Sequence, residues 1–168
     1  PYRMMTSRAE YRLLLRQDNA DIRLTEIGHE AGLIDDERYA RLQKKKELIA
    51  AEIERVEHVN LGTSEKVQKV LEEYGSTPLT SGTTLAELIR RPELSYEKLA
   101  AVDVHRPELP EDVQEQVDIN IKYDGYIKRQ MRQVEQFKKL ENKKIPENID
   151  YDQIHSLRLE AKQKLNQI

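Results

Sequence analysis

The sequence predicts an all-α fold, in which a helical subdomain is followed by a helical bundle built around one long helix. Three observations support this prediction. The longest apolar patterns repeat at spacings of three and four residues, and no segment alternates apolar and polar residues as a half-buried strand would. Several of these patterns follow a residue that favours a helix N-terminus. Leu, Glu, Lys, Arg and Ala are prominent, whereas the chain has one Phe and no Trp.

The first predicted helix starts at about Arg8, because Ser7 and Glu10 form a Ser-x-x-Glu capping box. It runs through the leucine triplet at 13–15. Asp18 and the residues around it are turn formers, so they are expected to end this helix.

Three arginines of that helix, Arg8, Arg12 and Arg16, recur every four residues and share one stripe. Apolar residues flank the stripe, so the guanidinium groups should be half buried, and no carboxylate on the same helix face is in reach. Leaving a buried charge without its partner costs about 3–5 kcal/mol, so partners are expected. Three kinds of partner are possible: Asp18 and Asp21 folded back onto the helix, another domain, or phosphate groups.

Two further helices are expected between residues 25 and 56. Thr25 can cap a short helix that ends at Gly32. The acidic pair at 35–36 begins a long helix to about Val56, whose apolar residues form a seam that requires a partner helix. The lysine run at 44–46 is predicted to be a solvated face.

The middle third is predicted to be a small helical subdomain of short pieces. Ser64 starts one helix, for which Gly75 is the stop signal. Thr84 starts a second helix with a Thr-x-x-Glu capping box, and Pro92 ends it. Ser95 caps a last turn or two.

The segment 107–110 is the best linker candidate, and a helix of about thirty residues is expected from Pro110 to about Asn142. Its second half is basic and carries a wide apolar arc, which predicts burial between neighbours. Gly125 indicates a close helix approach or a kink, and a last helix follows Pro146. The predicted segments are a junction with the Arg-rich helix, a helical subdomain, and a truncated C-terminal helical bundle, at 1–34, 35–105 and 106–168.

Several kinds of site are excluded by composition and spacing. The six glycines stand far apart, so neither a dinucleotide-binding turn nor a P-loop can form. The four histidines lack metal-ligand spacing, and without cysteine there is no thiolate chemistry, which favours the cytoplasm. No apolar run approaches the ~20 residues of a membrane helix. We therefore predict no catalytic residue, metal or cofactor in this chain, which we interpret as a fragment that is soluble and contacts no membrane.

Recognition of another molecule remains as the predicted role. The net charge of −3 argues against coating nucleic acid by bulk electrostatics, but it allows local basic patches. The first candidate group consists of arginines, whose guanidinium forks suit phosphates or carboxylates; the alternative is pairing with nearby aspartates or a neighbouring domain. It comprises Arg8, Arg12, Arg16 and Arg23.

The second candidate group mixes tyrosines with cations on the predicted long helix. Such a group can stack bases or hold a protein partner, and its alternative is a packed seam with a solvated basic edge. Its members are Lys122, Tyr123, Tyr126, Lys128, Arg129 and Arg132.

Several stretches resemble the C-terminal region of the MnmG family, also called GidA. They are TSRAEYRLLLRQDNADIRLT near the start, then GHEAGL and DDERY, and later RRPELSYEKL and VDINIKYDGYIKRQ. The resemblance spans nearly all 168 residues. One departure is Met5, where the family usually has Phe, and this change conserves packing. The family's amino-terminal portion and its final small helical segment have no counterpart here.

The resemblance implies a role in a tRNA modification complex. Members of this family are FAD-binding, NADH-using subunits that work as homodimers with the GTPase MnmE, in a heterotetramer, on carbon 5 of the wobble uridine of tRNA. Folate supplies the one-carbon unit. FAD lies in the family's amino-terminal domain, while the C-terminal helices bind MnmE and basic residues near the domain junction help to hold tRNA. We therefore expect a cytoplasmic docking region without a cofactor of its own; the alternative is a non-catalytic helical scaffold that mediates self-association.

Overall fold

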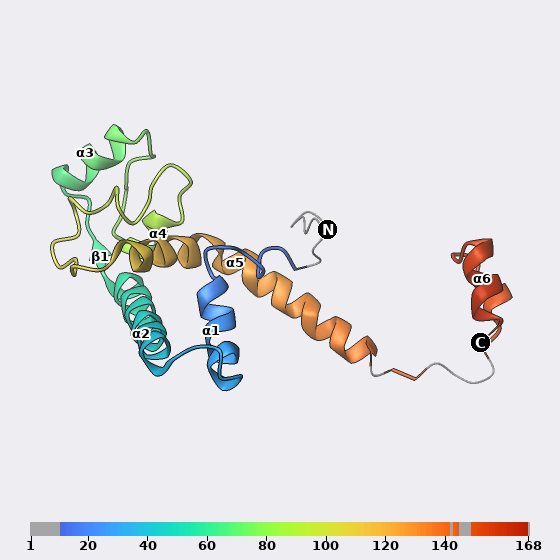
Figure 1. The fold of residues 1–168 in the computed structure, drawn as a ribbon. Helices are drawn as coiled ribbons and strands as arrows, with labels where there is room; N and C mark the ends of the chain where they lie inside the picture. Colours follow the sequence, from blue (N-terminus) through green and yellow to red (C-terminus); the bar gives the residue numbers. More distant parts are fainter. Residues whose placement is uncertain (1–10, 142, 145–148, 168) are drawn as a thin grey trace. The chain divides into compact units, whose positions relative to one another are not determined.

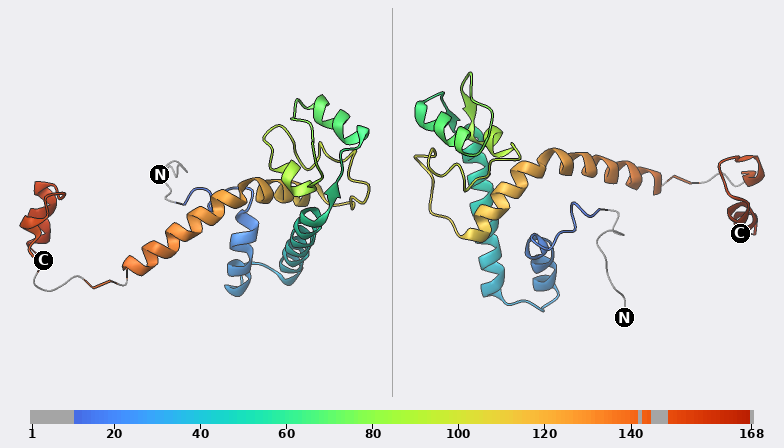
Figure 2. Two further views of the ribbon diagram at one scale, coloured as in Figure 1. Left: turned by 180° about the vertical axis from the view of Figure 1, so that it is seen from behind. Right: turned by 90° about the horizontal axis from the view of Figure 1, so that it is seen from above.

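A computed structural model describes residues 11–141, 143–144 and 149–167. The chain forms two compact units, Pro1–Gln130 and Met131–Ile168. In the first unit, α1 (Ala20–Glu30) packs against α2 (Asp36–His58), and the two helices lie side by side in Figure 1 and in both views of Figure 2.

The predicted helix through the leucine triplet is wrong, because residues 11–15 form turns. The N–H groups of Leu14 and Leu15 both donate to the carbonyl of Tyr11. The carbonyls of Leu13 and Leu14 accept from the side chains of Arg16 and Asn19 instead of from helical N–H groups. Side chains that bond nearby main-chain groups in this way compete with the helix. The predicted capping box lies outside the described residues.

The first helix of the structure, α1, begins after Asn19 rather than at Thr25, which lies inside the helix and is buried. Its end follows the prediction. Gly32 has a positive φ of 71°, and the N–H of Leu33 donates to the carbonyl of Gly28. This pattern satisfies the last carbonyls of the helix.

The long helix predicted to start at the acidic pair is confirmed as α2. The side chain of Asp35 accepts a hydrogen bond from the N–H of Arg38 at 2.7 Å, and it therefore caps the helix N-terminus. Leu42, Ile49 and Val56 form the buried face of α2, as the predicted seam requires.

A two-stranded antiparallel pair is the one departure from an all-α fold in the described part of the chain. It joins β1 (Asn60–Leu61) to β2 (Thr83–Thr84), with Asn60 opposite Thr84 and Leu61 opposite Thr83. With two residues a strand, it has too short a pattern for sequence periodicity to detect.

The two short helices of the middle third are confirmed. The first, α3 (Glu65–Glu73), starts after Ser64 and ends before Gly75, whose φ is 65°. The second, α4 (Leu85–Ile89), is capped by Thr84 Oγ1, which accepts from the N–H of Glu87 at 3.2 Å.

One hydrophobic core joins these elements. It combines the inner faces of α2, α3 and α4 with the segment 94–102 and the first half of the long helix α5 (Glu111–Glu141). Its most completely buried members, all at 0% exposure, are Val56, Leu71, Leu88, Ile89 and Val117.

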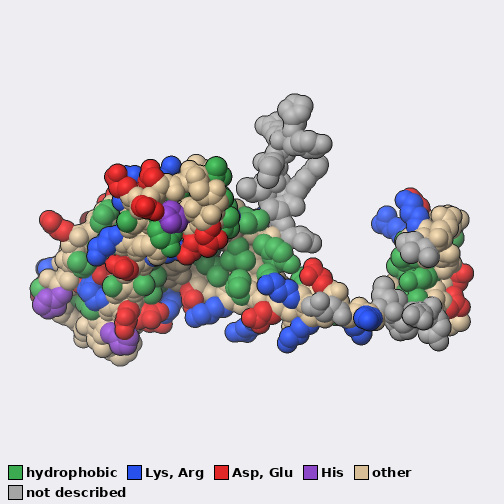
Figure 3. Space-filling model, turned by 60° about the horizontal axis from the view of Figure 1, so that its bottom comes forward, with side chains coloured by type: hydrophobic (Ala, Val, Ile, Leu, Met, Phe, Trp, Pro, Cys, Tyr) green, Lys and Arg blue, Asp and Glu red, His purple; other side chains and the backbone are tan. Residues whose placement is uncertain are grey.

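The exposure of α5 changes along its length. Val113, Val117 and Ile121 are at most 3% exposed, whereas Tyr123 is 42% and Tyr126 57% exposed. Figure 3 shows hydrophobic side chains gathered over the middle of this helix. The predicted burial of the second half between neighbours is thus not found in the described residues. The expected close approach at Gly125 is also not found in the described part of the chain, because a Cβ there would meet no atom within 4 Å besides its chain neighbours and the backbone of its own helix.

The second unit contains the end of α5, the 3-10 helix η2 (Tyr151–Gln153) and α6 (Leu159–Leu165). Asp152 joins η2 to α6, because its main-chain carbonyl accepts from Lys162 Nζ at 2.7 Å. The predicted last helix is therefore α6. The predicted division with boundaries after residues 34 and 105 stays a prediction. None of the helices in the described ranges is long and apolar enough to cross a membrane.

Candidate functional site

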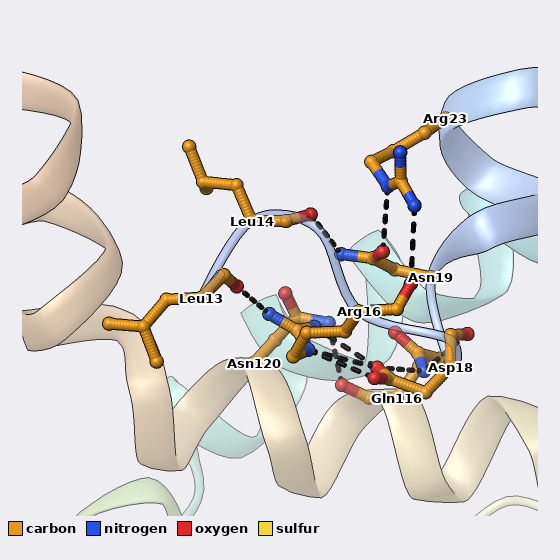
Figure 4. A network of polar contacts seen from close by, with 8 residues as sticks. All are labelled: Leu13, Leu14, Arg16, Asp18, Asn19, Arg23, Gln116 and Asn120. Atoms are coloured by element: carbon orange, nitrogen blue, oxygen red, sulfur yellow. Dashed lines mark hydrogen bonds and ion pairs between the residues drawn. The ribbon is translucent and has the colours of Figure 1, made fainter. Parts of the chain in front are cut away.

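A carboxylate holds the turn at 11–16 against α5. Arg16 Nε lies 3.0 Å from Asp18 Oδ1, and Arg16 Nη2 lies 3.1 Å from Asp18 Oδ2. From α5, Gln116 Nε2 donates both to Asp18 Oδ2 and to the Asp18 main-chain carbonyl, each at 3.0 Å (Figure 4). Gln116 is itself 2% exposed. The network joins residues far apart in sequence and fixes where the turn lies on the first unit.

The same network sets the charge of Asp18. Burial by itself raises the pKa of this carboxyl, but the hydrogen bonds from Arg16 and Gln116, together with the positive charge of Arg16, hold the pKa below its ordinary value. Asp18 is therefore a carboxylate at neutral pH, and it occupies the fork of the Arg16 guanidinium.

The predicted arginines have different surroundings. Arg23 joins the network, since its Nε donates to Asn19 Oδ1 at 2.9 Å and its Nη2 to the Arg16 carbonyl at 3.2 Å. Arg12 is exposed, and its side chain makes no hydrogen bond or ion pair with the rest of the described chain. Arg8 lies outside the described residues. Of the alternative partners that the sequence suggested for the arginines, Asp18 is the one that pairs with Arg16.

Two cations of the second candidate group are paired along α5. Lys122 Nζ lies 3.0 Å from Asp118 Oδ2, and Lys128 Nζ lies 2.8 Å from Asp124 Oδ2. Both pairs have the i, i+4 spacing that brings side chains together on a helix; the Lys122–Asp118 pair is largely buried, whereas the Lys128–Asp124 pair is exposed. They reduce the local excess of positive charge on this part of α5.

The aromatic members of that group lie together on the surface. The ring centroids of Tyr123 and Tyr126 are 6.4 Å apart and the ring planes are tilted by 54°. Arg129, one turn beyond Tyr126, is exposed, as is Arg132 in the second unit. Neither arginine has a hydrogen bond or ion pair to another residue in the described ranges. The structure therefore presents two rings and one uncompensated cation, Arg129, on the same stretch of the first unit.

Lys45 was missed by sequence reasoning, because it belongs to the lysine run predicted to be solvated. Its side chain is only 14% exposed, and its Nζ lies 2.8 Å from Asp21 Oδ2 and 2.9 Å from Asp112 Oδ2. Burial lowers the pKa of this ammonium, but the hydrogen bonds to Asp112 and Asp21 raise it above its ordinary value. One cation thus connects α1, α2 and the first turn of α5.

A buried charge cluster under the segment 95–106 was also missed. Glu52 is 3% exposed, and its Oε1 accepts from the hydroxyl of Tyr96 and from Arg55 Nη2, both at 2.6 Å. Arg55 Nη1 donates to Asp103 Oδ1 at 3.0 Å. Burial and the Glu52 hydrogen bond raise the pKa of Tyr96, so its hydroxyl keeps its proton. The partners are 44 and 48 residues apart, which no local pattern indicates.

Within the described ranges, no group of three or more His, Asp or Glu side chains is arranged to hold a metal ion. The surfaces above offer guanidinium groups and tyrosine rings, which recognise phosphates, carboxylates, bases or apolar side chains.

Comparison with known proteins matches both parts of the chain to one family. The family described as the tRNA modifying enzyme MnmG/GidA C-terminal helical domain matches residues 36–131, and the one described as the MnmG/GidA C-terminal helical bundle matches residues 133–168. Over all 168 residues, the chain is 65% identical to the tRNA uridine 5-carboxymethylaminomethyl modification enzyme MnmG of Lachnoclostridium phytofermentans. It is 62% identical to that of Caldicellulosiruptor saccharolyticus. It spans 27% of the length of each of these relatives.

A solved structure shares the fold. The form II crystal structure of Aquifex aeolicus GidA matches with a TM-score of 0.68 and 32% identity, over 99% of this chain and 25% of that one.

Proposed function

Since the chain belongs to the C-terminal helical region of the MnmG/GidA family, we propose that it is the docking region of an enzyme that modifies carbon 5 of the wobble uridine of tRNA. In this proposal the chain binds the partner GTPase MnmE and contributes contacts to tRNA. FAD and NADH bind outside it, and the parent protein acts as a homodimer with MnmE in the cytoplasm.

The observation that carries the proposal is the change of exposure along α5. The helix is fixed in the core up to Ile121, and directly beyond it Tyr123 and Tyr126 are exposed next to the uncompensated Arg129. Tyrosine and arginine are enriched among the residues that dominate binding energy at protein interfaces. A rigid helix that presents both is suited to hold a protein partner.

The partner role is tested by capture of MnmE. We expect the intact protein with Tyr123→Ala and Tyr126→Ala to bind MnmE at least about thirtyfold more weakly, because truncation of dominant interface residues costs about 2 kcal/mol or more. The matched control is Leu33→Ala with Val104→Ala, which removes two hydrophobic side chains that are 83% and 81% exposed elsewhere in the first unit. Equal affinity of the tyrosine and control variants would contradict the assignment.

The tRNA role is tested at Arg12, the described arginine of the first group that has no partner in the described chain. Loss of one phosphate contact reduces the slope of log K against log salt by about 0.7–0.9, so Arg12→Ala should lower the slope by this amount. Arg16→Ala is a poor probe, because Asp18 already occupies its guanidinium. An unchanged slope would assign Arg12 to packing against another domain.

The scaffold alternative predicts a different result. A protein that neither captures MnmE nor binds tRNA at low salt, but sediments as a stable oligomer, would favour self-association as the role of this region.

A further inference from the structure

A groove of about 590 Å³ lies between α1, α2 and the start of α5 in the first unit. The side chains of Leu42, Leu48 and Val113 contribute its apolar lining. Consecutive turns of α2 supply four cations to the lining: Arg38, Arg41, Lys44 and Lys45. Two carboxylates also line the groove, Asp21 from α1 and Asp112 from α5.

The two carboxylates of the groove are already occupied. Lys45 bridges Asp21 and Asp112 at 2.8 and 2.9 Å, so their negative charges face an ammonium and not the arginines. With four cations and two acids in the lining, the groove carries an excess of two positive charges.

Arg38 and Arg41 account for this excess. Both side chains are exposed, and neither makes a hydrogen bond or ion pair with another side chain in the described ranges. Lys44 is weakly paired, because its Nζ lies 3.6 Å from Glu47 Oε2 and both side chains are exposed. A spacing of three residues places Arg38 and Arg41 on the same face, about 4.5 Å apart along the helix axis.

The chemistry of the groove favours a phosphodiester. Two adjacent guanidinium forks bind the oxygens of phosphate groups in paired hydrogen bonds. The volume is in the range of small-molecule sites and admits a nucleotide unit, whose ribose or base can rest on the apolar lining. An acidic peptide would offer carboxylates to the same forks, but it lacks the planar base and ribose that fit beside the apolar lining, so it is the alternative occupant that the test distinguishes.

We propose that this groove binds a phosphodiester segment of RNA through Arg38 and Arg41. The inference rests on the proposed function, because the RNA it implies is the tRNA on which the protein would act. It adds a second point of contact, in a groove whose lining includes neither Arg12 nor the α5 tyrosines.

The test uses the intact protein and tRNA, with binding measured over a range of salt concentrations. Arg38→Ala with Arg41→Ala should reduce the slope of log K against log salt by about 1.4–1.8, the value for two phosphate contacts. Arg38→Lys with Arg41→Lys keeps both charges, so it should keep the slope while binding a few-fold more weakly. The matched control is Lys66→Ala with Lys69→Ala, which removes two exposed cations from α3 and should leave the slope unchanged.

Folding of the variants is checked by thermal unfolding, which should match wild type because neither arginine side chain has a partner in the described chain. A slope equal to that of the α3 control would overturn the inference. So would a loss of MnmE capture with unchanged tRNA binding, which would make the occupant a protein. If the wild-type protein itself binds no tRNA, the tRNA part of the proposed function fails together with this inference. If the wild type binds tRNA and the Arg38→Ala, Arg41→Ala variant binds equally well, only the assignment of the groove fails.

Discussion

Replacing Asp18 with Asn tests how the turn at 11–16 is held on the first unit. The side chain keeps its shape but loses its charge, so Arg16 loses its ion pair and Gln116 loses a charged acceptor. Hydrogen bonds to charged groups contribute about 1.5–3 kcal/mol, whereas exposed ion pairs contribute about 0–1 kcal/mol. Asp18 and Arg16 are 21% and 17% exposed, so we expect an intermediate loss of about 1–2 kcal/mol at pH 7.

The effect of Asp18→Asn on stability depends on pH. The pKa of Asp18 is lowered in the folded state relative to about 3.9 for an unfolded aspartate. Its contribution is therefore complete above the unfolded pKa and is lost as the pH falls through the folded pKa. The stability difference between wild type and Asp18→Asn, measured by urea unfolding, should be constant from pH 7 to about 5 and should shrink below about pH 4.

The control is Glu65→Gln, which removes one partner of an exposed pair on α3 and should change stability by less than about 0.5 kcal/mol. An Asp18→Asn difference that stays the same at pH 3 and pH 7 would refute the ionic explanation. A difference no larger than that of the control at pH 7 would mean that the network does not hold the turn in solution.

Four further substitutions are expected to change stability, as measured by urea unfolding. Gly75→Ala should destabilise by about 1–2 kcal/mol because Gly75 has a φ of 65°, whereas Gly125→Ala, in an exposed helical position with open space, should stabilise by about 0.5–1 kcal/mol; equal signs would contradict this reasoning. Lys45→Met should cost about 1–3 kcal/mol, since it leaves two carboxylates without their shared cation, and high salt should reduce the loss. Tyr96→Phe should cost about 1.5–3 kcal/mol through the lost hydrogen bond to buried Glu52, and a neutral result would mean that water replaces the hydroxyl.

The sequence predicted the helices whose starts are marked by local chemistry. The start signals at Asp35, Ser64 and Thr84 each depend on a few adjacent residues, and each precedes a helix in the structure, although only the side chains of Asp35 and Thr84 accept a capping hydrogen bond. The stop at Gly75 is equally local, because a single residue with positive φ ends the helix.

The first predicted helix failed because the same local reasoning ignored competing side chains. Arg16 and Asn19 take the carbonyls of Leu13 and Leu14, so the turn is satisfied without helical hydrogen bonds. Arg16 is held by Asp18, which also accepts hydrogen bonds from Gln116, and no pattern near the start of the chain can indicate a contact 98 residues away.

The candidate surfaces were predicted only in part for the same reason. The tyrosines of α5 were identified by type and spacing, but whether they are buried or exposed depends on which elements pack against the helix. The spacing of Arg38 and Arg41 can be read from the sequence. The groove beside them cannot, because it is formed by α1, α2 and α5, which Lys45 connects through its ion pairs with Asp21 and Asp112.

The contact between Gln116 and Asp18 also sets an order of events during synthesis. The two residues are 98 positions apart, so the ribosome adds the second roughly 5–20 s after the first at ordinary rates of synthesis. Throughout that interval the nascent turn has no α5 on which to settle, and Asp18 lacks one of its two side-chain donors. Arg12 therefore acquires its final position late, when most of the first unit has already been translated.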